Sequence, residues 1–271
     1  MAHAENGEFL LRIEDIDQSR ARPEWEAQIY DDLKWLGLWW PDPVMRQSDR
    51  QAAYNAALDD LWARGLLYVC TCSRADIKAA LSAPQEGVPT HGPDGLIYPG
   101  TCRWTQKYWE DNPRPKDVVL RLDMAGACRQ AGFEHRLNGN SAWQWFAGFT
   151  ETGQAGGTQE VEFTPDEMEQ NIGDIVLARR DMGTSYHLSV ILDDAAQGIT
   201  HVVRGEDLFE ATKIHVVLQR LLGLPTPVYH HHRLIRDENG KRLAKRDDAR
   251  AISLYRNEGA SPEDIRSKVG L

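Results

Sequence analysis

The sequence predicts an α/β protein whose main body is interrupted by an inserted module. Two observations support this prediction. Short apolar runs that end in polar residues alternate with amphipathic segments of helical spacing, as in proteins built from strands and helices in turn. Between 70 and about 140 this regularity gives way to a loop rich in proline and glycine, over 83–100, and to poor periodicity after it. At 271 residues the chain is long enough for one large body with an insert, or for two domains.

The amino-terminal segment begins with a strand and a helix. Residues 9–13 form a largely apolar run that predicts a buried strand, and the acidic run 14–17 follows it at once. The carboxyl end of a strand is a common place for a binding site in an α/β sheet. Pro23 then begins a predicted helix, which keeps apolar residues at helical spacing and ends at Gly37.

A second helix is expected after residues 48–51, whose order Ser-Asp-Arg-Gln has the form of a capping box. This helix ends near Gly65, and a short strand over 66–69 follows it. The predicted insert begins directly after that strand.

The regular pattern returns after the insert. Strands are expected over 174–179 and 199–203, with a regular segment over 186–194 between them. Thr212 can cap the helix that follows it. The order Ser-Pro-Glu-Asp at 261–264 indicates one last small helix.

Composition and charge narrow the possible functions. No stretch approaches the ~20 apolar residues of a membrane span, so a cytoplasmic protein without membrane contact is expected. The net charge of −10 argues against a general polyanion binder, and any RNA contact must therefore be local. The best candidate is 233–250, with seven basic and four acidic residues, for which a solvated loop is the alternative explanation.

The four cysteines do not suggest a disulfide framework. Cys70 and Cys72 stand one residue apart, and Cys102 follows Tyr98 in the same segment. Three thiolates with one oxygen or nitrogen ligand would form a closed tetrahedral zinc site that ties this segment to the main body. Buried thiols unrelated to the tyrosine are the alternative. Cys128 lacks a partner and is expected to be a core thiol.

A basic run near the carboxyl end, 242–246, reads Arg-Leu-Ala-Lys-Arg, and Val-Arg-Gly-Glu-Asp at 203–207 precedes it. With Tyr186 further upstream, these runs suggest activation of an amino acid by ATP. A loop that carries Lys245 can neutralise charge on triphosphate oxygens during attack at the α-phosphorus. Together with Arg-Ile-Glu-Asp-Ile-Asp at 12–17, they make the chain resemble the class I glutamyl-tRNA synthetase family.

The resemblance covers most of the chain and implies a class I synthetase fold. This fold is a Rossmann-like catalytic domain, a parallel sheet flanked by helices, with an inserted zinc-bearing module. The catalytic domain is then expected in two parts, 1–69 and 141–250, the second with a loop similar to the family's Lys-Met-Ser-Lys-Ser signature. The zinc-binding connective module takes 70–140, and a helical segment takes 251–271.

The resemblance also implies a glutamate pocket. Glutamate carries an ammonium and two carboxylates, so its pocket needs an acid for the amine and a guanidinium fork for the side-chain carboxylate. Glutamine would be penalised, because its amide donors would face guanidinium donors. By resemblance Glu14 is the acid, Arg204 is the fork and Tyr186 donates a hydroxyl. The alternatives are a structural ion pair of Glu14 with Arg204 and a core role for Tyr186.

Lys245 takes the place of the second lysine of the signature, and the resemblance therefore makes it a catalytic and ATP-binding residue. Arg242 replaces the first lysine and is expected to contact phosphate as well. Ala244 replaces the serine, so one hydroxyl is lost while both cationic positions remain. A solvated basic loop is the alternative.

The zinc ligands follow from a subgroup of short paralogues, the glutamyl-Q tRNA(Asp) synthetases. In that subgroup, two cysteines of a Cys-X-Cys, a tyrosine and a further cysteine hold zinc. By resemblance these ligands are Cys70, Cys72, Tyr98 and Cys102. His91 is a chemically more usual fourth ligand than a phenol, and it stays an alternative to the tyrosine.

Three consecutive histidines occupy 230–232. Successive side chains of a strand point to opposite faces. We therefore do not expect these histidines to bind a metal together.

The amino-terminal part departs from the family pattern. Class I synthetases open with a strand and a His-X-Gly-His motif that holds ATP phosphates, and no such motif occurs in this sequence. Met1 is expected to fall inside the first helix of the fold. The expectation is thus either a chain that lacks upstream sequence or a degenerate synthetase.

The short segment after Lys245, and Val190 in place of the asparagine typical of full-length enzymes, favour the short paralogues. Such enzymes form glutamyl-adenylate from L-glutamate and ATP with Mg²⁺. They then pass the glutamyl group to queuosine in the anticodon of tRNA(Asp). We expect this activity, in a monomer with structural Zn²⁺. The alternatives are a fragment of a protein-synthesis glutamyl-tRNA synthetase and a non-catalytic remnant that binds RNA or a partner.

Overall fold

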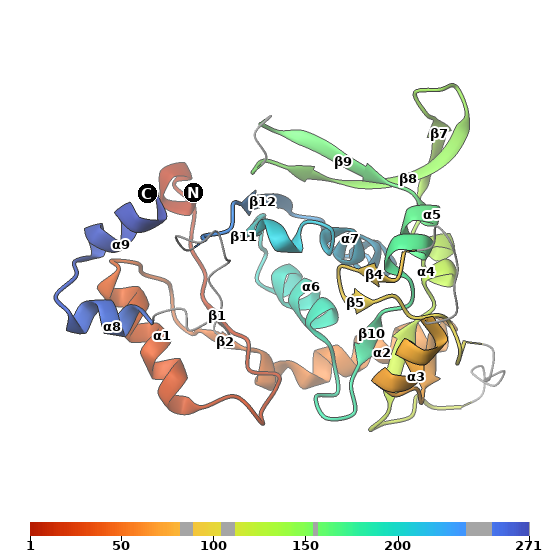
Figure 1. The fold of residues 1–271 in the computed structure, drawn as a ribbon, viewed down its shortest axis with the longest axis horizontal. Helices are drawn as coiled ribbons and strands as arrows, with labels where there is room; N and C mark the ends of the chain where they lie inside the picture. Colours follow the sequence, from red (N-terminus) through yellow and green to blue (C-terminus); the bar gives the residue numbers. More distant parts are fainter. Residues whose placement is uncertain (82–88, 104–111, 154–156, 237–250, 271) are drawn as a thin grey trace. The chain divides into compact units, whose positions relative to one another are not determined.

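The structure, a computed structural model, describes most of the chain in two compact units (Figure 1). The described residues are 1–81, 89–103, 112–153, 157–236 and 251–270. The first unit comprises Met1–Asp49 and Arg233–Leu271, and the second comprises Arg50–His232.

In its described residues, the first unit pairs two short parallel strands and carries three α-helices. Its elements are η1 (Ala2–Glu5), β1 (Arg12–Ile13), α1 (Pro23–Trp35), β2 (Met45–Arg46), most of η2 (Gln47–Arg50), α8 (Ile252–Asn257) and α9 (Pro262–Val269). The strand predicted over 9–13 is thus confined to its last two residues. The helix predicted from Pro23 is confirmed, because proline fits the first turn of a helix and Gly37, with φ of 76°, follows its end.

Ion pairs attach α8 to α1. The Arg256 guanidinium lies 2.5 Å from Asp31 and 3.0 Å from Asp32, and it stacks over the Trp35 ring. The last predicted helix is confirmed as α9. Ser261 and Asp264 close its capping box, each accepting a backbone N–H of the other.

The capping box predicted at 48–51 is wrong. The hydroxyl and the backbone N–H of Ser48 both donate to the Asp15 carboxylate, at 2.7 and 2.9 Å. Ser48 is therefore tied to the segment after β1, and the helix that follows has no side-chain cap at Arg50.

The second unit holds a mixed sheet, a small antiparallel sheet and helices packed on them. Its elements before the long hairpin are α2 (Gln51–Ala63), β3 (Leu67–Cys70), α3 (Arg74–Leu81), β4 (His91–Gly92), β5 (Gly95–Leu96), β6 (Val119–Leu122) and α4 (Met124–Gln130). Its remaining elements are β7 (Glu134–Leu137), β8 (Trp143–Glu151), β9 (Gln159–Phe163), α5 (Pro165–Glu167), η3 (Met168–Ile172), β10 (Val176–Ala178), α6 (Tyr186–Ala196), β11 (His201–Gly205), η4 (Glu206–Leu208), α7 (Thr212–Leu221) and β12 (Val228–His232).

The mixed sheet has the order β11-β12-β8-β7, with β9 also paired to β8. Strands β11 and β12 are parallel over five residue pairs, and α7 connects them as the crossover of a βαβ unit. Strand β12 meets β8 in parallel, whereas β7 and β9 pair with β8 in antiparallel fashion. The smaller sheet, β10-β6-β3, is antiparallel.

Strands predicted over 66–69, 174–179 and 199–203 are confirmed as β3, β10 and β11, with shifted ends. The regular segment over 186–194 is the helix α6. The cap predicted at Thr212 is wrong, because Ala211 takes the cap position and the Thr212 hydroxyl bonds to β11 and β12 instead.

One continuous core lies between the two sheets and the helices of the second unit. Its most completely buried members include Leu120, Leu122, Leu188, Ile214 and Val217. Cys128 joins the same core as a buried thiol, as predicted, and burial raises its pKa to about 12. Among the described residues, no helix has the length and apolar character needed to cross a membrane.

Candidate functional site

Arg204 lies near the end of β11, and all of its guanidinium nitrogens bond within the second unit. Its Nη2 donates to the Thr212 hydroxyl at 2.6 Å and to the Leu208 carbonyl at 3.3 Å. Its Nε and Nη1 face two imidazoles, those of His231 and His215. The guanidinium is thereby fixed in one orientation before any ligand arrives.

The imidazole of His215 links Arg204 to a second histidine. Because a guanidinium can only donate, Arg204 Nη1 donates to His215 Nδ1, at 3.0 Å. The His215 proton must then be on Nε2, from which it reaches Nδ1 of His187 at 3.1 Å. His187 therefore carries its own proton on Nε2, which lies 3.4 Å from the Asp94 carboxylate. The hydrogen bonds thus run in one direction, from the cation to an acid.

The imidazole of His231 makes a similar link on the other side. Arg204 Nε donates to His231 Nε2 at 3.1 Å, so the His231 proton is on Nδ1 and is donated to Glu151. Both Glu151 and His231 are completely or almost completely buried. The Glu151 carboxylate also accepts the backbone N–H groups of His231 and Gly153. Any side chain at Gly153 would collide with the His231 backbone.

The pKa values of both imidazoles agree with neutral rings. Burial, reinforced by the Arg204 charge and the His187 ring, holds the pKa of His215 well below its ordinary 6.5. Burial also lowers the pKa of His231, against the opposing effect of the Glu151 hydrogen bond. Burial would raise the pKa of Glu151, but hydrogen bonds from His231 and Gly153 outweigh it and lower that pKa. Neutral imidazoles therefore flank one guanidinium cation.

Tyr186 lies beside the same histidine. It begins α6, whose start is capped by the Ser185 hydroxyl accepting the backbone N–H of Leu188. The Tyr186 ring centroid is 5.9 Å from that of His215, which in turn contacts Arg204. Two of the three residues predicted to bind glutamate are thus brought together around one imidazole.

Glu14, the third of these residues, belongs to the first unit, where it follows β1. Its side chain is 47% exposed and lies 3.4 Å from the Arg12 guanidinium. Lys245 and Arg242 lie outside the described residues.

Several residues of this network have no signal in the sequence. His215 and Glu151 sit within regular secondary structure and carry no motif, and the sequence suggested Thr212 only as a helix cap. The one available signal is the histidine run, because the alternation of strand side chains predicts that His231 and its neighbours face opposite sides. The structure confirms this, with His231 buried and His232 exposed.

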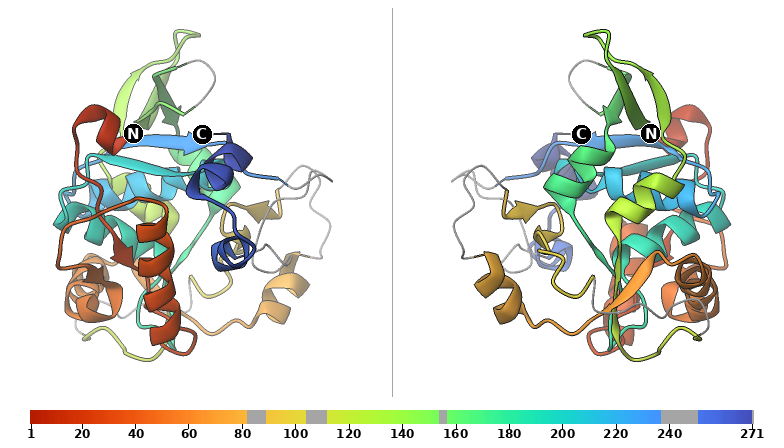
Figure 2. Two further views of the ribbon diagram at one scale, coloured as in Figure 1. Left: turned by 90° about the vertical axis from the view of Figure 1, so that its left-hand side faces the viewer. Right: turned by 90° about the vertical axis from the view of Figure 1, so that its right-hand side faces the viewer.

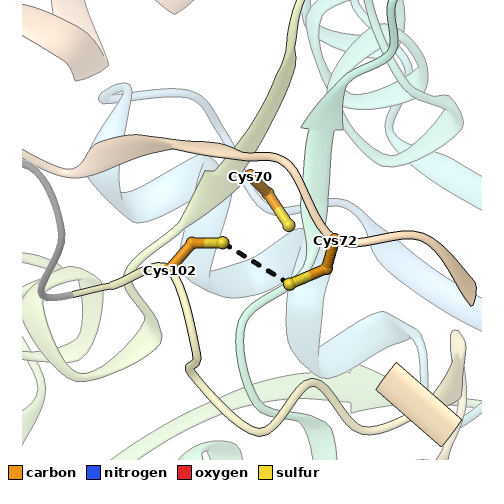
Figure 3. A group of neighbouring side chains, drawn as sticks. All are labelled: Cys70, Cys72 and Cys102. Carbon is orange, nitrogen blue, oxygen red and sulfur yellow. Dashed lines mark hydrogen bonds between the residues drawn. The ribbon is translucent and has the colours of Figure 1, made fainter. Parts of the chain in front are cut away.

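The three cysteines of the insert converge at the end of β3 (Figure 3). The sulfur atoms of Cys70, Cys72 and Cys102 all lie within 4.8 Å of one another. The Tyr98 hydroxyl is 3.3 Å from the Cys72 sulfur and accepts the backbone N–H of Cys102 at 2.8 Å. The four predicted ligands are therefore assembled in one place.

Within this cluster, the Cys102 thiol ionises more readily than an ordinary thiol. Burial would raise the pKa of Cys102, but hydrogen bonds, chiefly from Tyr98 and from the Thr71 backbone, outweigh it and lower that pKa to about 6. Burial raises the pKa of Cys72. Three thiols and a phenol fit the preference of Zn²⁺ for sulfur in a closed site. Within the described segments, no histidine or carboxylate joins the three sulfurs, and His91 bonds instead to the neighbouring Thr90.

Comparisons with known proteins match this chain to one family. The catalytic domain of class I tRNA synthetases (E and Q) matches residues 1–122 and 157–271. A glutamyl-Q tRNA(Asp) synthetase of Rhodobacter capsulatus is 58% identical over 277 residues, covering 100% of this chain and 91% of that protein. Another, from Symbiobacterium thermophilum, is 36% identical, and the match covers 97% of this chain and 76% of that protein.

A solved structure agrees on the fold. A glutamate tRNA ligase from Elizabethkingia meningosepticum, in complex with its amino acid, superposes with a TM-score of 0.65 at 23% identity. The match covers 98% of this chain and 54% of the ligase, so this chain spans about half the length of that enzyme.

These matches define an aminoacyl-tRNA synthetase-type ligase of class I, with a Rossmann-like α/β fold. Within that class, the chain belongs to the glutamyl-Q tRNA(Asp) synthetase family.

Proposed function

We propose that the protein activates glutamate with ATP and transfers the glutamyl group to the queuosine base in the anticodon of tRNA(Asp). The observation that carries this proposal is the 58% identity, over the whole chain, to a protein named for this reaction. The fixed guanidinium of Arg204, with Tyr186 next to the His215 ring that contacts it, supplies the matching chemistry for an anionic amino acid.

Activation begins when an oxygen of the glutamate α-carboxylate attacks the α-phosphorus of ATP, and pyrophosphate leaves. In the proposed arrangement Glu14 pairs with the substrate ammonium, Arg204 grips the side-chain carboxylate, and Tyr186 donates its hydroxyl. Lys245 and Arg242 stabilise charge on the phosphate oxygens. Class I synthetases use ATP with Mg²⁺, which when bound offsets negative charge on the phosphates.

Transfer follows when a queuosine hydroxyl attacks the carbonyl carbon of glutamyl-adenylate. AMP leaves, and an ester joins the glutamyl group to the base. Holding both reactants in one site supplies much of the rate.

The thiol cluster is proposed as a structural zinc site formed by Cys70, Cys72, Tyr98 and Cys102. The positions of the three sulfurs, and a phenol in contact with one of them, support it. The site would join the end of β3 to the loop that follows β5.

Two variants test the glutamate and ATP assignments. We expect Arg204→Ala to abolish glutamate-dependent pyrophosphate exchange, because the carboxylate loses its cation. Lys245→Ala should slow activation more than it weakens glutamate binding. Arg129→Ala, an exposed arginine on α4, is the matched control and should exchange at the wild-type rate. Wild-type exchange by Arg204→Ala would refute the pocket, and a loss confined to the glutamate KM in Lys245→Ala would refute its phosphate role.

Structural similarity to glutamate tRNA ligases supports a second candidate function, glutamylation of tRNA(Glu) for protein synthesis. Both candidates share the activation step and differ in the acceptor. The identity of the glutamylated tRNA therefore separates them.

A further inference from the structure

Strands β7 and β8 form a hairpin (Figures 1 and 2), and one of its faces carries aromatic side chains. The strands are antiparallel, and His135 lies opposite Trp145 while Leu137 lies opposite Trp143. Paired residues, and residues two apart on one strand, share a face of a sheet. These four side chains therefore lie on the same side of the hairpin.

The same face of β8 is buried at one end and exposed at the other. Farther along the strand, Ala147 and Phe149 are part of the core, exposed by only 3% and 2%. Trp143 and Trp145 continue this face but are 65% and 50% exposed. The apolar face of β8 thus continues beyond the core and presents two indole rings to solvent. Exposed apolar patches of this kind are unusual on a surface that binds no partner.

The rings form an ordered surface. The His135 ring lies 4.5 Å from the Trp145 ring at an interplanar angle of 24°, and 5.1 Å from the Trp143 ring at 34°. We call these three side chains the Trp–His platform. The Asn138 side chain fixes the tip of the hairpin by accepting the backbone N–H groups of Asn140 and Ala142, both at 2.9 Å.

On the opposite face, Arg136 stacks over the Phe146 ring and pairs with Glu162 of β9. These contacts hold the hairpin against its neighbouring strand. The platform is therefore organised before a ligand binds.

The charge distribution makes this part of the surface less repulsive to a polyanion than the rest of the acidic protein. The chain has a net charge of −10, yet residues 137–146 contain no charged side chain. No carboxylate in the tip would repel a phosphate backbone. The platform also falls in 123–156, the segment that the catalytic-domain match leaves out. It therefore lies outside the part of the chain that matches the catalytic domain.

We propose that the Trp–His platform binds unpaired nucleotides of the RNA substrate by base stacking. Flat rings exposed on a sheet are suited to the faces of bases, and stacking needs no particular sequence. That this RNA is tRNA(Asp) rests on the proposed function; the stacking itself does not. The hairpin would add affinity for RNA without entering the chemistry of activation.

The test compares the affinity for unmodified tRNA(Asp) transcript, measured by filter binding at one fixed salt concentration, among matched variants. The double variant Trp143→Leu with Trp145→Leu keeps apolar side chains but removes the rings, and we expect its Kd to rise roughly tenfold or more. The double variant to Phe keeps aromatic faces and should recover most of the affinity. Trp39→Leu, which removes another tryptophan that is 64% exposed, should bind like the wild type.

An unchanged Kd in the double Leu variant, with a native circular dichroism spectrum, would overturn the proposal. A second outcome would also overturn it: sedimentation velocity shows a dimer for the wild type and a monomer for the double Leu variant, while the two bind RNA equally well. The platform would then join two copies of the chain. Glutamate-dependent pyrophosphate exchange is measured on the same proteins. If the wild type lacks exchange while the Leu variant still loses RNA affinity, the proposed function fails and the platform stands.

Discussion

At Arg204, the direction of each hydrogen bond decides the protonation of its neighbours. The guanidinium only donates, so His215 and His231 must each present an unprotonated nitrogen to it. Each imidazole passes its remaining proton toward a carboxylate, through His187 to Asp94 or directly to Glu151. A proton added to either ring would place a second cation against the guanidinium and break the link.

We therefore expect His231→Gln to weaken glutamate recognition by misorienting Arg204. Loss of a hydrogen bond to a charged group costs about 1.5–3 kcal/mol, or roughly a 10- to 100-fold rise in the glutamate KM, with a smaller change in kcat. Pyrophosphate exchange at varied glutamate concentration measures both constants. His201→Gln, an exposed histidine on β11, is the control. Equal KM values in the two variants would show that His231 does not position the arginine.

The lowered pKa values of His215 and His231 predict a pH-dependent stability. Below pH 6.5 the unfolded chain binds protons at these positions, while the folded protein leaves both rings neutral down to a lower pH. The unfolded state then binds more protons, so the free energy of unfolding is at its full value above pH 6.5 and falls as the pH drops toward the folded pKa values.

Urea unfolding between pH 7.5 and 5.5 measures this effect. Each buried histidine contributes a slope of up to about 1.4 kcal/mol per pH unit, so His215→Gln should flatten the profile relative to the wild type and to His201→Gln. Parallel profiles for all three proteins would contradict the assigned protonation states.

At the scale of the elements, sequence patterns correctly predicted the helices whose ends are determined by interactions between neighbouring residues. The helix from Pro23 and the helix after Ser261 form where proline, helical spacing and a capping box indicate them. The two wrong caps, at Ser48 and Thr212, share one physical reason. Each hydroxyl bonds to a residue distant in the sequence or in a different element, and such partners leave no trace in a local pattern.

The thiol cluster and the histidines around Arg204 differ in the same way, because only the thiol cluster has a signal in the local sequence. Close sequence spacing showed Cys70 and Cys72 as a pair, and the structure places Cys102 with them. The contacts of His231 instead join residues 27 and 80 positions apart, on different strands. Sequence alone could name Arg204 by resemblance, but not the imidazoles that hold it.

The thiol cluster gives a prediction for the link between β3 and the loop that follows β5. We expect one zinc per chain by elemental analysis, and a lower Tm after removal of the metal by a chelator, because a metal bound only by the folded state stabilises it. Cys102→Ser should lose the metal, whereas Cys128→Ala, which removes a core thiol, should retain it. Equal zinc content in both variants would exclude the cluster as the metal site.

At the scale of the whole molecule, an acidic protein must recognise RNA locally. The net charge of −10 disfavours general attraction to a polyanion. In the proposed function, specific contacts such as stacking at the Trp–His platform supply affinity, and the acceptor base supplies selectivity. The chain belongs to the glutamyl-Q tRNA(Asp) synthetase family, so the identity of the acceptor tRNA is the property that tests the proposed function.

The most direct measurement follows radiolabelled glutamate into purified tRNA in the presence of ATP. We predict that label enters tRNA(Asp) that contains queuosine, and that the same tRNA without queuosine, and tRNA(Glu), stay unlabelled. Label in tRNA(Glu), or equal label in tRNA(Asp) with and without queuosine, would contradict transfer to the queuosine base.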